Sequence, residues 1–294
     1  MNIIKKLLIA LLINLVCLVP VYADSTEHDH DVDSRSLNVM VSKLMSWYGS
    51  LISNSETLGF QEITSDWNIY RTQYPTDINQ IQILQTDLTL IADKNHYQFK
   101  VSSLIHHEGG RKKIDDNFVF NVDSDGLPKI TEISFNNNET ASSSKNVSDE
   151  IFDAMYYKIR EFSYAWLAYM DGVEAIQTVI NVADWSDAPY EINVGSTNIN
   201  QPVKETLVTR KQFLYKGEHN LRLIDLVSLD TKTNTYLLDL TMNWQGVNEK
   251  KQTVIAKINQ KIELKIMPGG RWHVISIKEK HLLPDLTPWQ DLLC

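Results

Sequence analysis

The chain has 294 residues, of which 28 are basic and 37 acidic, so its net charge is −9 at neutral pH. An acidic chain without a basic stripe would be repelled by phosphates, which excludes the usual electrostatics of nucleic-acid binding. The length and a hydrophobic content of 43% are sufficient for two hydrophobic cores, which favours two domains.

The first 23 residues have the composition of a secretory signal peptide. Two lysines precede an apolar stretch that is shorter than the roughly 20 residues of a membrane span, and Ala23 is a small residue suited to cleavage. We therefore expect cleavage near Ala23, a periplasmic or secreted product, and no stable membrane insertion. Cleavage removes Cys17 and leaves Cys294, which either stays unpaired or joins two chains into a homodimer.

Residues 24–33 are acidic and lack apolar periodicity, which is typical of a disordered leader. The His and Asp residues in this leader have no fixed geometry, so no metal site is predicted. From Ser34 onward, apolar residues recur at spacings of three and four, which predicts an amphipathic helix with Asp33 or Ser34 as its N-cap. A second such helix is predicted after Ser148, ending near Gly172.

Each predicted helix is followed by a variable region and then by strands, and the two sets of strands repeat each other. With an offset of 139 residues, Tyr97 corresponds to Tyr236 and Val101 to Leu240. In both copies apolar residues occupy every second position around a short polar turn, which predicts β-hairpins. A polar run between the copies indicates a linker. We expect α+β domains at residues 34–136 and 148–284, a linker at 137–147 and a C-terminal tail at 285–294.

The strand that precedes the last hairpin of each copy alternates apolar and polar residues, which predicts one buried and one solvated face. Asp116 lies on the apolar face of this strand in the first copy. An offset of 144 residues places Gln260 at the same point in the second copy. Each copy therefore sets one polar side chain into an otherwise apolar strand face.

This order of elements, closed by the hairpin residues Gly270, Arg271 and Trp272, resembles the nuclear transport factor 2-like superfamily. The resemblance covers the hairpin regions and first helices of both copies, although the first copy has Pro128 where the second has Trp272. It implies two tandem cone-like domains, each with a curved antiparallel sheet around a helix and a pocket between them. Members include ketosteroid isomerase, scytalone dehydratase, polyketide cyclases and noncatalytic binding or assembly modules.

In such a cone the apolar face of the strand looks towards the pocket or the core, where burial raises the pKa of a carboxyl group. Asp116 is therefore the candidate general acid or base, with Tyr97 as a phenolic donor on a neighbouring strand. A bulge that turns Asp116 outward is the alternative. Gln260 has no titratable group, so it would orient a ligand or satisfy a backbone group.

Tyr236, Met242 and Trp244 are expected to line an apolar cavity beside Gln260, the alternative being a filled core. The sequence has no phosphate-binding loop, no helical histidine pair and no serine nucleophile elbow, and no cofactor is predicted. The favoured hypothesis is a noncatalytic binding or assembly module whose partner is a small apolar molecule or an envelope protein. The alternative is an isomerase, dehydratase or cyclase that uses Asp116.

Overall fold

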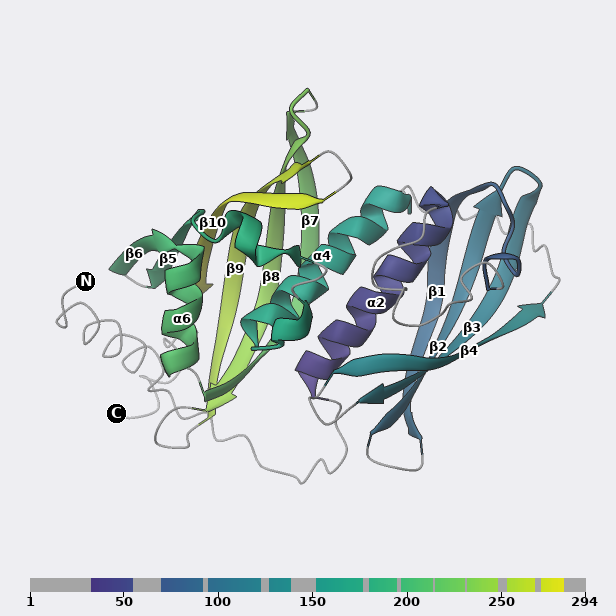
Figure 1. Cartoon of the computed structure of the whole chain (residues 1–294), viewed down its shortest axis with the longest axis horizontal. Coiled ribbons are helices and arrows are strands. Elements are labelled where there is room, and N and C mark those ends of the chain that lie inside the picture. The colour runs from purple at the N-terminus through teal and green to yellow at the C-terminus, as the bar shows by residue number, and fades with distance from the viewer. Residues whose placement is uncertain are drawn as a thin grey trace, which may run out of the picture. The chain divides into compact units, whose positions relative to one another are not determined.

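The structure is a computed structural model in which the described residues form helices and mainly antiparallel sheets, so the α+β class is confirmed (Figure 1). The predicted signal peptide, most of the leader and linker, and the C-terminal tail lie outside the described residues. Among the described residues no helix combines the length and apolarity needed to cross a bilayer. The described ranges are 33–54, 70–91, 95–122, 127–138, 152–176, 180–194, 197–213, 215–230, 232–247, 253–267 and 271–282.

The chain divides into two compact units, and the division falls between Trp166 and Leu167. Both residues belong to helix α4 (Ala154–Met170), so the observed division lies inside a helix and not in the predicted linker at 137–147. The first part of α4 packs in the first unit, where the Tyr157 hydroxyl donates to the Ile81 carbonyl at 2.5 Å.

Helix α2 (Ser34–Ser53) begins at the N-cap Asp33, whose carboxylate accepts a hydrogen bond from the backbone N–H of Arg35 at 3.0 Å. The helix ends at Asn54, which has the left-handed conformation that asparagine tolerates at a C-cap. One face of α2 carries Trp47 and Tyr48, both fully buried. This face contributes to the core of the first unit, as the spacing of its apolar residues predicts.

The first unit contains a four-stranded antiparallel sheet in the order β1-β2-β3-β4. Alternation buries every second side chain of β3, including Ile114, Phe118 and Phe120, against the helix side of the sheet. The Phe118 ring meets Trp47 of α2 edge to face, with centroids 6.0 Å apart. The strands are β1 (Ile78–Ile91), β2 (His96–His107), β3 (Gly110–Val122) and β4 (Pro128–Asn138).

The second unit contains a six-stranded sheet in the order β6-β5-β10-β9-β8-β7. The sequence predicted a wholly antiparallel sheet, but this sheet is mixed. Its strands pair antiparallel except for β10 and β5, which run parallel. Its elements are η2 (Glu174–Ile176), η3 (Val182–Trp185), β5 (Pro189–Val194), β6 (Thr197–Pro202), α6 (Val203–Phe213), β7 (Tyr215–Asp230), β8 (Thr235–Val247), β9 (Thr253–Ile266) and β10 (Trp272–Leu282).

The strand registers place the two inward polar residues at corresponding points. Asp116 of β3 lies opposite Val101 of β2, and Gln260 of β9 lies opposite Leu240 of β8. Val101 and Leu240 are the residues related by the sequence offset of 139. Both polar side chains are buried, with 1% of Asp116 and none of Gln260 exposed. The alternation therefore continues through Asp116, and no bulge turns it outward.

Candidate functional site

The carboxyl group of Asp116 is enclosed by two tyrosines on the helix side of the first sheet. The Tyr48 hydroxyl donates to Oδ2 at 2.6 Å, and the Tyr74 hydroxyl donates to Oδ1 at 2.7 Å. Trp47 extends the network, because its indole N–H donates to the Tyr74 hydroxyl at 3.2 Å. All four side chains are less than 5% exposed, so this carboxyl group is part of the core.

Burial raises the pKa of Asp116 from 3.8 to about 6, although the hydrogen bonds from the two tyrosines oppose this rise. Burial beside the same carboxyl group also raises the pKa values of Tyr48 and Tyr74 well above 10. The expected shift of the Asp116 pKa is thus present. Its cause is enclosure among core side chains, and a shift of this kind also occurs at purely structural sites.

Tyr97, the expected phenolic partner of Asp116, lies elsewhere on β2. Its register partner is Phe120, whereas Asp116 lies opposite Val101, four residues further along β2. At about 3.3 Å per residue, this separation is about 13 Å, too far for a hydrogen bond. The structure therefore brings Tyr48 and Tyr74 to Asp116, and does not bring Tyr97 there.

A groove of about 420 Å³ lies on the opposite face of the same sheet. Asp115 and Asn117 flank Asp116 in sequence, and strand alternation turns them to the face away from α2. The lining residues come from all four strands and are Gln85, Asp87, Lys100, Val101, Ser102, Asp115, Asp116, Asn117, Ser134, Phe135 and Asn136.

The polar lining residues form two rows across the sheet, because their strand registers coincide. The first row follows the pairs Gln85–Ser102, Ser102–Asp115 and Asp115–Asn136. The second row follows the pairs Asp87–Lys100, Lys100–Asn117 and Asn117–Ser134. Sequence reasoning treated these alternate residues as a solvated face and did not identify a site among them.

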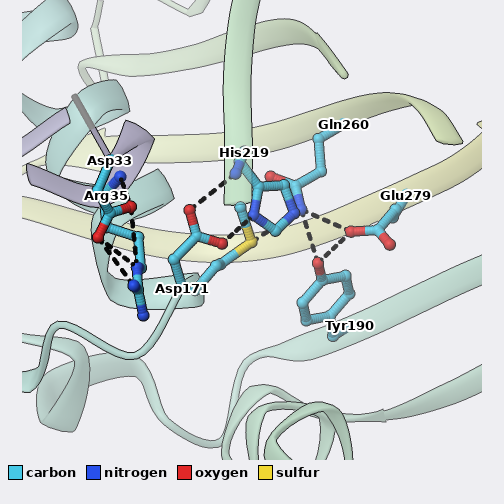
Figure 2. Close-up of polar contacts among 8 residues, drawn as sticks. Asp33, Arg35, Asp171, Tyr190, His219, Gln260 and Glu279 are labelled. Atoms are coloured by element: carbon cyan, nitrogen blue, oxygen red, sulfur yellow. Dashed lines mark hydrogen bonds and ion pairs between the residues drawn. The ribbon is translucent and has the colours of Figure 1, made fainter. Parts of the chain in front are cut away.

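In the second unit, Gln260 belongs to a buried polar network (Figure 2). Its Nε2 donates to the Tyr190 hydroxyl at 2.6 Å and to Glu279 Oε2 at 2.7 Å. Tyr190 donates to the same carboxylate oxygen of Glu279. The other oxygen, Oε1, lies 2.6 Å from His281 Nε2. Glu279 is 1% exposed, so its carboxyl group is enclosed by hydrogen-bonding partners.

A second buried pair lies at the end of α4, where Asp171 meets His219 of β7 (Figure 2). The carboxylate lies 2.5 Å from His219 Nδ1 and accepts the backbone N–H of His219 at 2.8 Å. The pair fixes the orientation of the imidazole ring, because one carboxylate holds both its Nδ1 and its backbone. Sequence reasoning missed it, since the two residues are 48 positions apart and neither lies in a recognisable motif.

Of the residues expected to line an apolar cavity, Met242 and Trp244 are buried in the core and Tyr236 is half-buried at its edge. Met242 is fully buried and Trp244 is 6% exposed. A Cβ atom on Gly217 or Gly246 would come within 2.4 Å of the Trp244 ring, so these glycines leave the space that the indole occupies. Tyr236 packs edge to face on Trp272, with centroids 6.5 Å apart. The alternative of a filled core describes these three residues best.

No protein family model matches the sequence, and no curated protein matches it. Among solved structures, a ketosteroid isomerase-like protein from Erwinia carotovora atroseptica is 13% identical, covering 43% of this chain and 95% of that chain with a TM-score of 0.32. The hexachlorocyclohexane dehydrochlorinase LinA-type3 from Novosphingobium barchaimii is 13% identical, covering 44% of this chain and 86% of that chain with a TM-score of 0.35.

Mtr2 from Candida albicans, in its complex with the Mex67 M domain, is also similar. It is 13% identical, with 43% of this chain and 95% of that chain covered and a TM-score of 0.30. The three structures include an enzyme and a protein that assembles with another protein.

Proposed function

We propose that this protein is a noncatalytic binding module that holds a polar ligand in the groove across β1–β4. The groove itself is the observation that carries this proposal: about 420 Å³, lined by polar side chains from all four strands. A ligand there would meet carboxylate, ammonium, amide and hydroxyl groups. The chemistry of the proposed ligand is therefore polar, in contrast to the apolar molecule that the sequence suggested.

The surroundings of Asp116 support a binding role over the alternative in which it acts as an acid or base. A catalytic acid or base must come within hydrogen-bond distance of the group it protonates or deprotonates. Asp116 is 1% exposed, and the hydroxyls of Tyr48 and Tyr74 already occupy its two oxygens. A substrate would have to displace both tyrosines from the core, at the cost of two buried hydrogen bonds.

The binding proposal is tested by filling the groove with a larger side chain. Ser102→Tyr places a ring in the middle of the first row, and Thr241→Tyr is its matched control, because the offset of 139 relates the two positions. Wild type and both variants are incubated with a small-molecule extract of the host, and retained compounds are measured by mass spectrometry after ultrafiltration.

We expect the wild type and Thr241→Tyr to retain the same compound and Ser102→Tyr to lose it. Equal retention by all three proteins, or retention by none of them, would refute binding in the groove. Thermal unfolding of each protein is measured in parallel, so that a variant that fails to fold is recognised before its retention is compared.

The His219–Asp171 pair favours a second candidate function, an acid–base enzyme of the isomerase, dehydratase or cyclase kind. A carboxylate on Nδ1 stabilises the tautomer in which Nε2 carries the lone pair, the arrangement used by a general base. His219 is 1% exposed, so this function requires the side chains around its ring to move apart when a substrate binds. The pair lies beside the buried network of Gln260. Met170 directly precedes Asp171, and the Met170 sulfur lies 3.5 Å from Gln260 Nε2.

This second function predicts proton exchange. Small ketones with acidic α-hydrogens would exchange them for deuterium in D₂O when the protein is present, as followed by proton NMR. His219→Gln should abolish the exchange, whereas Asp116→Asn should preserve it. Exchange that survives in His219→Gln would rule out this pair as the base.

A further inference from the structure

We infer that the groove takes a neutral, polyhydroxylated ligand about the size of a disaccharide. This inference rests on the proposed binding function and adds the chemical class of the ligand. It follows from the dimensions, the charge and the hydrogen-bonding groups of the two rows of side chains.

The dimensions follow from the geometry of the sheet. Neighbouring strands are about 4.8 Å apart, so four strands span about 14 Å, and the two rows are about 7 Å apart along the strands. The groove is thus longer than it is wide. Two linked pyranose rings lying across the strands would cover its length and contact both rows.

The formal charges of the groove balance. Asp87 lies directly opposite Lys100 in the strand register. Asp115 lies 3.6 Å from the ammonium group of Lys113, which extends from the same strand. Lys113 lies beside the lining, and Asp116 lines the groove while its carboxyl group bonds Tyr48 and Tyr74 on the other face. The charged groups on the groove face are then two carboxylates and two ammonium groups, which give no net charge. Neither an anion such as a phosphate nor a cation such as a polyamine would therefore be selected by charge.

The hydrogen-bonding groups suit hydroxyls. Asn117 Nδ2 donates to the Ser134 hydroxyl at 3.2 Å, which leaves the Ser134 proton to be donated elsewhere. Asn117 Oδ1 is buried and accepts no hydrogen bond from the described residues. A ligand hydroxyl can accept from the Ser134 hydroxyl and donate to a neighbouring carboxylate or amide oxygen, which an apolar group cannot do.

The apolar residues of the lining turn their side chains away from the groove. Val101 and Phe135 are the apolar residues of the lining, and both point into the core. Val101 is 1% exposed, and the Phe135 ring packs on Tyr74 with centroids 5.4 Å apart. A ligand in the groove would therefore contact polar side chains, through their aliphatic carbons as well as through their polar groups.

The corresponding face of the second sheet carries different polar side chains and supplies a control variant. There Asn259 Nδ2 donates to Asp239 at 2.6 Å. The Lys261 ammonium group lies 3.6 Å from the same carboxylate. Offsets of 144 and 139 relate Asn259 to Asp115 and Asp239 to Lys100, so the two faces differ in chemistry at equivalent positions.

The test is isothermal titration of the full chain with defined probes. The saccharide probes are cellobiose, lactose, trehalose and N,N′-diacetylchitobiose, and the competing classes are represented by putrescine, hexanoate and inorganic phosphate. We expect at least one disaccharide to bind saturably, with an affinity that changes less than twofold when about 0.5 M salt is added, because a neutral ligand is not screened.

Asn117→Leu should weaken this binding at least tenfold, while Asn259→Leu leaves it unchanged. Ser134→Ala, which removes one hydroxyl without adding volume, is a second groove variant in case Asn117→Leu folds poorly. No binding of any saccharide, or binding unaffected by both groove variants, would overturn the ligand class, as would preferential binding of putrescine, hexanoate or phosphate.

The two proposals fail separately. If the host extract yields a compound that Ser102→Tyr cannot retain but no saccharide binds, the binding function stands and the ligand class is wrong. If the extract yields no such compound and no saccharide binds, both proposals are refuted.

Discussion

The raised pKa of Asp116 makes the stability of the first unit depend on pH, and Asp116→Asn isolates this dependence. The pKa is about 6 in the folded protein and about 3.9 in an unfolded chain. The folded state therefore holds the proton more tightly than the unfolded state. The stabilisation from this group is fully present below about pH 4 and is lost as the pH rises through about 6.

The size of the effect follows from the shift. A difference of about two pKa units corresponds to about 3 kcal/mol, since each unit is worth about 1.4 kcal/mol. Asparagine does not titrate, so the stability of the variant does not fall with rising pH on account of residue 116. Glu161, whose pKa is raised by burial to about 7, titrates in both proteins and its contribution cancels in the comparison. The advantage of wild type over variant should therefore shrink by about 2 kcal/mol between pH 4 and pH 7, because the unfolded carboxyl group is already half ionised at pH 4.

Urea unfolding measures this difference at several pH values, with NMR signals from β3 used to follow the first unit. The constant cost of replacing a hydrogen-bond acceptor of Tyr48 and Tyr74 drops out, because only the change with pH is compared. Asp115→Asn, on the groove face of the same strand, is the control and should show a much smaller change. Parallel profiles for wild type and Asp116→Asn would refute the argument that this carboxyl group is held protonated by burial.

Three further predictions concern other parts of the chain. Gly246→Ala should destabilise the protein by about 1–3 kcal/mol and lower its thermal unfolding midpoint, because the new Cβ would lie 2.3 Å from the Trp244 ring. Gly49→Ala is the control and should cost less, because the nearest contact of its new Cβ is at 3.3 Å. Mass spectrometry of protein secreted by its host should show a chain that begins near Asp24, and a full-length mass would contradict the signal peptide. If Cys294 joins two chains, nonreducing electrophoresis should show a dimer that Cys294→Ser abolishes, whereas a monomer in wild type would show that this cysteine stays unpaired.

The long helices and strands could be predicted because each buries one face, and burial leaves a period in the sequence. Alternation along β3 and β9 indicated that Asp116 and Gln260 point inward, as they do. The elements β5, β6 and α6 were not predicted, since they are short and their apolar residues follow no clear period. The pairing of β5 with β10 joins Tyr190 to Ile277, and a contact so distant in sequence has no local signal.

The partners of the inward polar residues were also beyond local prediction. Asp116 meets Tyr48 and Tyr74, which are 68 and 42 residues away, because α2 and the segment before β1 fold over the sheet. Tyr97 was the natural candidate from sequence because it lies on the neighbouring strand, but strand register places it too far along. Periodicity indicates which way a side chain points, whereas the packing of distant segments determines what it meets.

Each unit buries one carboxyl group beside an inward polar position of its sheet, but the carboxyl group lies on a different strand in each. Phe135 lies opposite Asp116 in the first unit, and Glu279 lies opposite Gln260 in the second. The offset of 144 relates Phe135 to Glu279, so the carboxyl group of the second unit lies one strand further along the sheet than that of the first.

In both units a tyrosine hydroxyl donates to the buried carboxyl group, from Tyr48 or Tyr74 to Asp116 in the first and from Tyr190 to Glu279 in the second. The buried carboxyl group and its tyrosine donor are present in both units, although the carboxyl group lies on different strands. This fits a structural role in the core, because each buried acceptor needs a hydrogen-bond donor wherever it lies. Catalysis would instead require one carboxyl group in one place relative to a substrate. The inward residues of both units therefore serve the core, and the candidate for function is the outer face of the first sheet, where the polar groove lies.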